Sequence, residues 1–121
     1  PHLYERNTIA YTGTHDNETS AQWFEKLPKE DKEYCLNYIN HTCGNPVDSL
    51  IKATLACVAD TAIIPMQDWL SLGAEARMNI PSTTGTNWKW RMLKEEFDEN
   101  LIKKMKSFTL LYGRGYQAKR G

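Results

Sequence analysis

The sequence predicts an α/β fold, rich in helix, in which two short strands lie parallel and a helical connection joins them. Two apolar segments have the length of a strand, Ile9 to Thr12 and Ala62 to Met66. In the long stretch between them, apolar residues recur at helical spacing. Because a crossover that contains helices joins parallel strands, we expect the two strands to pair in one sheet. The predicted order of elements is β-α-α-α-β-loop-α.

Proline and glycine bound the first two helices. The first strand breaks at Gly13, and the segment Glu18 to Leu27 is then predicted to form a short amphipathic helix that Pro28 stops. A second helix is predicted from Lys29 to His41, with Gly44 behind it. Its apolar side chains form one stripe, which consists of Tyr34, Cys35, Tyr38 and Ile39. Both helices therefore have a face that can pack on a core.

The third helix has the clearest start. Asn45 can cap it, Pro46 suits the first helical position, and Asp48 favours the positive end of the helix dipole. The apolar residues at helical spacing are Val47, Leu50, Ile51, Leu55 and Val58. We expect this face of the helix to pack on the core.

The second strand and the segments after it have less regular patterns. Ala62 to Met66 is apolar without alternation, which is typical of a parallel strand covered on both faces. Pro65 cannot donate to a strand ladder, so we expect the strand to fray there. The remaining chain is predicted as one helical turn from Asp68 to Leu72, a loop from Gly73 to Trp88 that is too polar for the core, and an amphipathic helix from about Leu93 to Tyr112.

Composition excludes several classes of protein. Fifteen basic and fifteen acidic residues cancel in this 121-residue chain, so no net field attracts nucleic acid or an anionic membrane. A local group of basic residues near the C-terminus is interpreted as a solvated helix face and tail, and consists of Lys103, Lys104, Lys106, Arg114, Lys119 and Arg120. No apolar run reaches the roughly 18 residues of a membrane span, and no signal peptide is visible. Three cysteines without a disulfide framework indicate reduced thiols and a cytoplasmic location.

The run from Tyr11 to Asn17 carries the main functional signal. It places His15 and Asp16 at the carboxyl end of the first strand, where α/β barrels carry their catalytic groups. Asp16 can accept hydrogen bonds from sugar hydroxyls and stabilise an oxocarbenium-like transition state, while His15 can donate to the same oxygens. The alternative is that Asp16 or Asn17 only caps the helix that follows.

Two further segments could line a site for sugars. Trp88 and Trp90 have flat indole rings that could stack on sugar faces, although packing in the core is the commoner use of such a pair. The loop Glu75 to Asn79 offers an acid, a base and an amide. Its alternative is an internal ion pair between Glu75 and Arg77.

Other polar residues give weaker signals. Cys35, His41 and Cys43 match no tight zinc spacing, so we expect no metal site. Asp60 lies at the amino end of the second strand, the end that serves stability in barrels. Asp68 is expected to cap a turn. No pair of carboxylates suited to glycosidic chemistry is evident.

Three blocks of sequence occur in this order: TGTHDNETSAQW, ADTAIIPMQDWLSLGAEARMNIP and TGTNWKWRM. Together they resemble the C-terminal quarter of the 4-α-glucanotransferases, the amylomaltase or disproportionating-enzyme family of glycoside hydrolases. The resemblance extends from about Ile9 to Arg91. The three blocks in this order and spacing are highly specific, whereas THDN alone would not be.

The resemblance implies a (β/α)8 TIM barrel of which residues 1–121 are the C-terminal portion, about the last two β/α units. It implies a retaining double displacement that transfers α-1,4-glucan segments between maltooligosaccharides, without cofactor or metal. Asp16 matches the family's third catalytic carboxylate, the transition-state stabiliser. His15 is expected to contact the same sugar, and Asn79 is expected to line the substrate groove.

The resemblance also predicts what the chain lacks. In the family the nucleophilic aspartate and the acid/base glutamate belong to earlier strands, upstream of Pro1 here. We therefore expect a fragment that is inactive alone and whose partners are glucans and the missing N-terminal part of the same enzyme. The alternative is a glucan-binding or self-associating fragment, because bare strand edges favour association.

Overall fold

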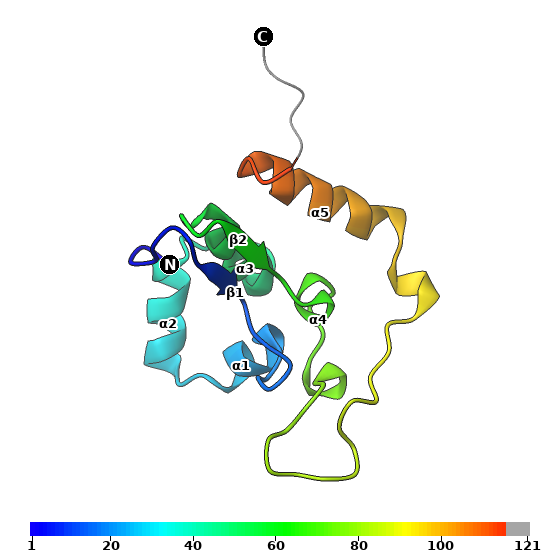
Figure 1. Ribbon diagram of the computed structural model, residues 1–121. Coiled ribbons are helices and arrows are strands. Elements are labelled where there is room, and N and C mark those ends of the chain that lie inside the picture. Colours follow the sequence, from blue (N-terminus) through cyan, green and yellow to red (C-terminus); the bar gives the residue numbers. More distant parts are fainter. Residues whose placement is uncertain (116–121) are drawn as a thin grey trace.

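Two short parallel strands form the centre of the fold (Figure 1), which a computed structural model describes for residues 1–115. β1 (Ile9–Tyr11) pairs with β2 (Thr61–Ile63), with Ala10 opposite Ala62. The predicted parallel pair is confirmed. The helices are α1 (Ser20–Lys26), α2 (Lys29–Tyr38), α3 (Pro46–Ala56), α4 (Met66–Trp69) and α5 (Glu99–Leu111), with 3₁₀ turns at Ala74–Ala76 and Lys94–Glu96.

The helix α3 carries the core. Its predicted start is confirmed, since the Asn45 side chain accepts a hydrogen bond from the Val47 amide at 2.9 Å and Pro46 is the first helical residue. The buried cluster consists of Val47, Ile51, Leu55, Trp69 and Leu101. Val58 was expected on the same face, and this is wrong: α3 ends at Ala56, and Val58 is 55% exposed.

Helix α1 is shorter than predicted at both ends, and helix α2 is shorter at its C-terminal end. Thr19 caps α1 by accepting from the Gln22 amide at 3.2 Å, so the helix begins at Ser20 instead of Glu18. Helix α2 ends at Tyr38, because the chain turns into the left-handed region at Asn40 (φ 53°) before His41. None of the residues of α2 is buried, so its predicted apolar stripe only partly meets the core.

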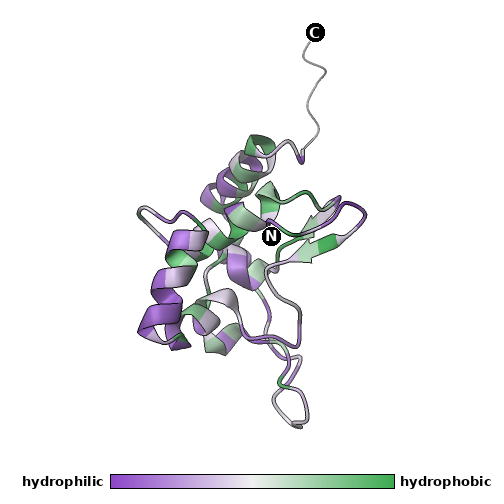
Figure 2. Cartoon of the chain, turned by 90° about the vertical axis from the view of Figure 1, so that its left-hand side faces the viewer, coloured by the Kyte–Doolittle hydropathy of each residue, from purple (hydrophilic) through white to green (hydrophobic). Residues whose placement is uncertain are grey.

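One face of the strand pair is bare within the described residues. The second strand ends at Ile63, before Pro65, as expected from the missing amide of proline. The side chains of Ile9, Tyr11 and Ile63 are 54%, 43% and 44% exposed. Figure 2 shows hydrophobic (green) colour along these strands, where residues 1–115 provide no second covering layer. The prediction of a strand covered on both faces is therefore not met by this part of the chain.

The predicted helix from Leu93 to Tyr112 is two elements. Phe97 leaves the helical region with ψ at 68°, because the Asp98 side chain accepts from the Leu101 amide at 2.8 Å and starts α5 anew. Leu101 enters the core, and the Phe108 ring lies 5.9 Å from that of Trp69. None of the helices of residues 1–115 is long and apolar enough to span a membrane.

Two members of the basic group near the C-terminus serve the fold, which corrects their interpretation as a solvated face. The Lys104 ammonium lies 3.1 Å from an Asp48 carboxylate oxygen and donates to the Trp69 carbonyl at 2.7 Å. Arg114 donates to the backbone at the end of α3. Lys119 and Arg120 lie outside the described residues.

Candidate functional site

Two loops meet at the carboxyl end of the strand pair. One loop leads from β1 to α1, the other follows α4, and Figure 1 shows both on the same side of the strands. The Asn79 side-chain amide from the second loop donates to Asp16 Oδ1 in the first loop at 2.6 Å. The structure thus joins two predicted site residues that lie far apart in the sequence.

The Asp16 carboxylate is only partly satisfied inside the chain. The His15 Nε2 atom lies 3.4 Å from Asp16 Oδ2, and the side chains of His15 and Asp16 are 57% and 49% exposed. Helix α1 is capped by Thr19, and Asn17 accepts from the Thr14 amide at 2.8 Å. The interpretation of Asp16 or Asn17 as a helix cap is therefore wrong, and Oδ2 of Asp16 stays directed toward solvent and the imidazole.

Arg77 bridges the two loops. Its guanidinium donates to the Asp16 carbonyl at 2.9 Å and to the Asn79 carbonyl at 3.0 Å. Glu75 instead accepts from the Gly73 amide at 2.9 Å, so the alternative of a Glu75–Arg77 ion pair is wrong for this loop. The sequence places Arg77 on a candidate site loop but does not reveal its bridging role, because its acceptors are backbone carbonyls that leave no side-chain pattern.

Trp88 presents a flat apolar surface beside His15. The two ring centroids are 5.1 Å apart with an angle of 38° between the planes, and Trp88 is 51% exposed. Its amide donates to the Met78 carbonyl at 2.6 Å, which fixes the far end of the loop. The alternative of core packing is wrong for Trp88, whereas Trp90 is half-buried. The His15 imidazole thus neighbours both the Trp88 indole and the Asp16 carboxylate.

The surface around these residues is hollowed. A hollow of about 710 Å³ lies at the other end of the strands, whereas one of about 590 Å³ includes Thr12, Asp16 and Arg77 in its wall. A smaller one of about 160 Å³ is lined in part by His15 and Met78. Two hollows therefore lie beside the His15 and Asp16 side chains.

Comparison with known proteins assigns the family. A profile of glycoside hydrolase family 77, described as 4-alpha-glucanotransferase, matches residues 1–96, which is most of the chain. The chain belongs to the 4-alpha-glucanotransferase family.

Individual relatives agree with this assignment. The chain is 42% identical over 118 residues to the chloroplastic/amyloplastic 4-alpha-glucanotransferase of Solanum tuberosum, covering 94% of this chain and 20% of that protein. It is 45% identical over 116 residues to the 4-alpha-glucanotransferase of Clostridium butyricum, covering 94% and 24%. A solved amylomaltase from Streptococcus agalactiae, in complex with acarbose, superposes with a TM-score of 0.90 at 45% identity, covering 93% of this chain and 23% of that one. The chain thus spans less than a quarter of the length of these glucanotransferases.

Asp68 of this glucanotransferase chain has a different role from the one expected. It caps no turn of its own, since its carboxylate accepts from Thr12 Oγ1 at 2.5 Å, from the Ser20 amide at 2.8 Å and from Ser20 Oγ at 2.8 Å. Its exposure is 2%. Local sequence does not reveal this, because the donor residues Thr12 and Ser20 lie 56 and 48 residues earlier in the chain.

The cysteine and histidine candidates for metal binding lie on α2 and in the segment between α2 and α3. His41 Nδ1 is 2.8 Å from Ser49 Oγ, and Cys35 and Cys43 are free thiols. Burial raises the pKa of the Cys35 thiol above its ordinary value, which favours the neutral form. Within residues 1–115, His, Cys, Asp and Glu form no group of three or more that could hold a metal ion.

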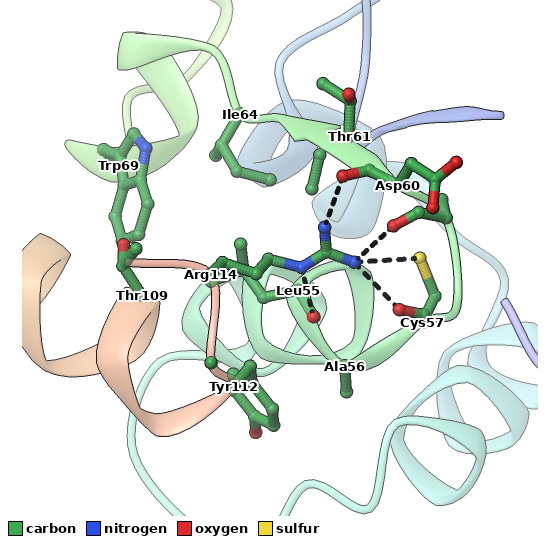
Figure 3. A pocket seen from close by; sticks show the side chains of 13 residues that line it. Leu55, Ala56, Cys57, Asp60, Thr61, Ile64, Trp69, Thr109, Tyr112 and Arg114 are labelled. Atoms are coloured by element: carbon green, nitrogen blue, oxygen red, sulfur yellow. Dashed lines mark hydrogen bonds between the residues drawn. The ribbon is translucent and has the colours of Figure 1, made fainter. Parts of the chain in front are cut away.

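The opposite end of the strands is organised around Arg114 (Figure 3). Its guanidinium points into the hollow of about 710 Å³ and donates to three carbonyls at 2.7–2.8 Å, those of Leu55, Cys57 and Ala59. Asp60 accepts from the Asn7 amide at 2.8 Å at the same end. These contacts support the prediction that the amino end of the strands serves stability.

Proposed function

We propose that the whole protein to which this chain belongs transfers α-1,4-glucan segments between maltooligosaccharides, and that Asp16 is its transition-state stabiliser. One observation carries this proposal above all. The Asp16 carboxylate stands half exposed at the carboxyl end of β1, with one oxygen held by Asn79 and the other beside His15. A charge fixed in this way requires little rearrangement when positive charge develops on a substrate.

The proposed reaction is a retaining double displacement. A nucleophilic carboxylate attacks the anomeric carbon of the donor glucan while an acid protonates the departing oxygen. The 4-hydroxyl of an acceptor glucan then displaces the carboxylate while the conjugate base of that acid takes up the hydroxyl proton, so the configuration is retained. In both steps the sugar ring gains oxocarbenium character, which the Asp16 carboxylate stabilises by charge. We infer that the nucleophile and the acid/base residue lie in other parts of the whole protein and that the 121-residue chain is inactive alone.

We infer further that β1 and β2 are the last two strands of a (β/α)8 barrel. The bare face of the strand pair, with Ile9, Tyr11 and Ile63, supports this placement, since barrel strands are covered on both faces. The share of 20–24% that the chain covers in its relatives fits two of eight units. The free thiols favour a cytoplasmic location.

The proposed substrates are α-1,4-glucans and maltooligosaccharides. The amylomaltase from Streptococcus agalactiae is described in complex with acarbose, and this chain superposes on it closely. The exposed indole of Trp88 beside His15 provides an apolar face suited to a sugar ring.

The test is the disproportionation of maltotriose by a full-length glucanotransferase that carries this sequence. We expect glucose and longer maltooligosaccharides to form, and Asp16→Asn to lower the rate by about 1,000-fold or more with an unchanged melting temperature. Asp31→Asn is the matched control, because Asp31 is an exposed carboxylate on α2 away from the site. Near-normal transfer by Asp16→Asn would refute the assigned role, and conversion of maltotriose by the pure 121-residue chain would refute its inactivity.

A glucan-binding or self-associating module is the second candidate. The exposed Trp88 and the bare strand face favour it. Sedimentation of the 121-residue chain with maltoheptaose distinguishes the two. A monomer that binds no maltoheptaose would remove this candidate.

A further inference from the structure

The carboxylate of Asp68 is buried without a basic partner. It is 2% exposed, and within residues 1–115 no ion pair joins it to a lysine, arginine or histidine. Burying a carboxylate is costly unless hydrogen bonds replace its hydration. Three donors satisfy it, namely the Thr12 hydroxyl and both the amide and the hydroxyl of Ser20. A buried acid held by three donors fixes the segments from which those donors come.

The donors mark the two ends of the loop that carries the site. Thr12 directly follows β1, and Ser20 is the first residue of α1. The segment between them contains His15 and Asp16. Because Ser20 donates to both carboxylate oxygens, through its amide to Oδ1 and through its hydroxyl to Oδ2, the orientation of the Asp68 side chain is defined as well as its position.

The same short helix also holds the second loop. Gln67, the neighbour of Asp68 on α4, donates from its side-chain amide to the Ala76 carbonyl at 3.2 Å. Ala76 is fully buried, although the loop was expected to be too polar for the core. It directly precedes Arg77, and Asn79 follows in the same loop. Helix α4 therefore anchors both loops whose side chains meet at the Asp16–Asn79 hydrogen bond.

We propose that Asp68 is a positioning residue for glycosyl transfer, which sets the location of the Asp16 carboxylate by tying together both ends of its loop. This inference rests on the proposed function of Asp16. Asp68 touches no substrate and takes no part in proton transfer. Its effect arises because a displacement of the reacting groups by about 1 Å can lower a rate about 100-fold. Loss of the Asp68 hydrogen bonds to Thr12 and Ser20 therefore lowers kcat and leaves KM largely unchanged, since most of the substrate contacts remain.

The experiment compares three substitutions in a full-length glucanotransferase that carries this sequence. Asp68→Ala removes all three acceptor contacts, and Thr12→Val removes one of them with little change of shape. Asp68→Asn keeps an oxygen for the Ser20 amide, and both hydroxyls can rotate to accept from the new amide group. Thr109→Val is the matched control, since the Thr109 hydroxyl donates only within α5, to the Met105 carbonyl at 2.7 Å.

We expect kcat for maltotriose to fall about 100-fold in Asp68→Ala and about 10-fold in Thr12→Val, with KM unchanged. Asp68→Asn should recover most of the loss, and Thr109→Val should match the parent. All rates are measured well below each variant's melting temperature, so that loss of stability alone does not lower kcat. The recovery by Asp68→Asn and the separation of kcat from KM distinguish positioning from a purely structural role.

Two results would overturn the inference. The first is parental kcat in a folded Asp68→Ala enzyme. The second is the combination of parental kcat in Thr12→Val with a raised KM in Asp68→Asn. If Asp68→Ala does not fold, these two milder variants decide whether Asp68 positions the loop. Failure of the proposed function is recognised separately, because transfer would then persist in Asp16→Asn.

Discussion

The two ends of the β1–β2 pair use their polar groups in opposite ways. At the amino end, the Arg114 guanidinium donates to backbone carbonyls of Leu55, Cys57 and Ala59, and little hydrogen-bonding capacity is left over. At the carboxyl end, the side chains of His15 and Asp16 are about half exposed. The first end uses its polar contacts to hold the fold together, whereas the second leaves polar side chains partly exposed. The two ends therefore differ in how much hydrogen-bonding capacity the described residues leave unused.

The cause of the difference lies in the elements that stop at each end. Helix α3 ends at Ala56, so its last carbonyls need donors, and Arg114 provides them from the segment after α5. At the carboxyl end Thr19 and Asp68 already satisfy the start of α1. The Asp16 carboxylate is therefore not required by the backbone around it.

After the loss expected from Asp16→Asn, a further large effect is expected at the carboxyl end, from Asn79→Ala. Losing the 2.6 Å hydrogen bond to Asp16 Oδ1 should lower kcat by about 100-fold, because the carboxylate loses its link to the second loop. The melting temperature should stay within the scatter of replicate measurements, since both side chains are partly exposed. Rates of maltotriose conversion and a thermal melt check this, with Asn37→Ala on the exposed face of α2 as control. A large loss of stability with parental kcat would show that the Asn79–Asp16 hydrogen bond serves the fold and not the reaction.

Arg114→Met should produce the inverse result. Four backbone carbonyls lose a charged donor, that of Asp60 at a longer 3.5 Å, and we expect a loss of about 3 kcal/mol in the free energy of unfolding. The kcat of the folded enzyme should be unchanged, because the contacts lie at the other end of the strands. Denaturant titration and maltotriose kinetics on the same samples test both statements. Arg6→Met, at an exposed arginine, is the control, and a fall in kcat without destabilisation would contradict the structural assignment.

The sequence was informative where one short segment determines the outcome. Asn45 and Pro46 defined the start of α3, and the order of elements predicted the parallel strands. His15 and Asp16 were found because a polar pair after an apolar strand is a local pattern. The resemblance to the family then added Asn79, which local pattern placed only on a loop with a possible ion pair.

The sequence was uninformative where a partner lies far along the chain. The sequence predicts a turn cap at Asp68, yet the donors to its carboxylate are Thr12 and Ser20. Arg114 was grouped with solvated basic residues, although its acceptors are backbone carbonyls that no side-chain pattern reveals. The break between Phe97 and Asp98 was missed because a side-chain cap outweighed continuous helical spacing. Long-range hydrogen bonds thus account for the differences at Asp68 and Arg114, whereas a local side-chain cap accounts for the break before α5.

Trp88→Ala should have a smaller effect, confined to binding at the carboxyl end. Removing an exposed indole from beside His15 should raise KM for maltotriose by about 10-fold, in line with the stacking energy of one aromatic ring. Trp88→Phe should recover part of the loss, because a flat ring remains. Kinetics at several acceptor lengths check this. An unchanged KM would show that the sugar lies elsewhere in the site.

The smallest expected effect concerns the alkylation rates of the three thiols. The rate at Cys57 tests how well the amino end of the strands is shielded from solvent. Cys43 is exposed and should react with iodoacetamide first. Burial raises the pKa of the Cys35 thiol, so less thiolate is present at pH 8 and its alkylation should be several-fold slower than that of Cys43. The difference between the two rates should narrow as the pH rises.

Cys57 is half-buried beside the Arg114 guanidinium, with its Sγ 4.0 Å from Nη2, and should react faster in Arg114→Met. Mass spectrometry of the labelled peptides measures all three rates. Arg114→Met could instead leave the Cys57 alkylation rate unchanged while lowering stability. The Arg114 hydrogen bonds would then join the segment after α5 to the end of α3 without shielding Cys57 from reagent. The two strand ends would in that case differ in hydrogen bonding but not in solvent access.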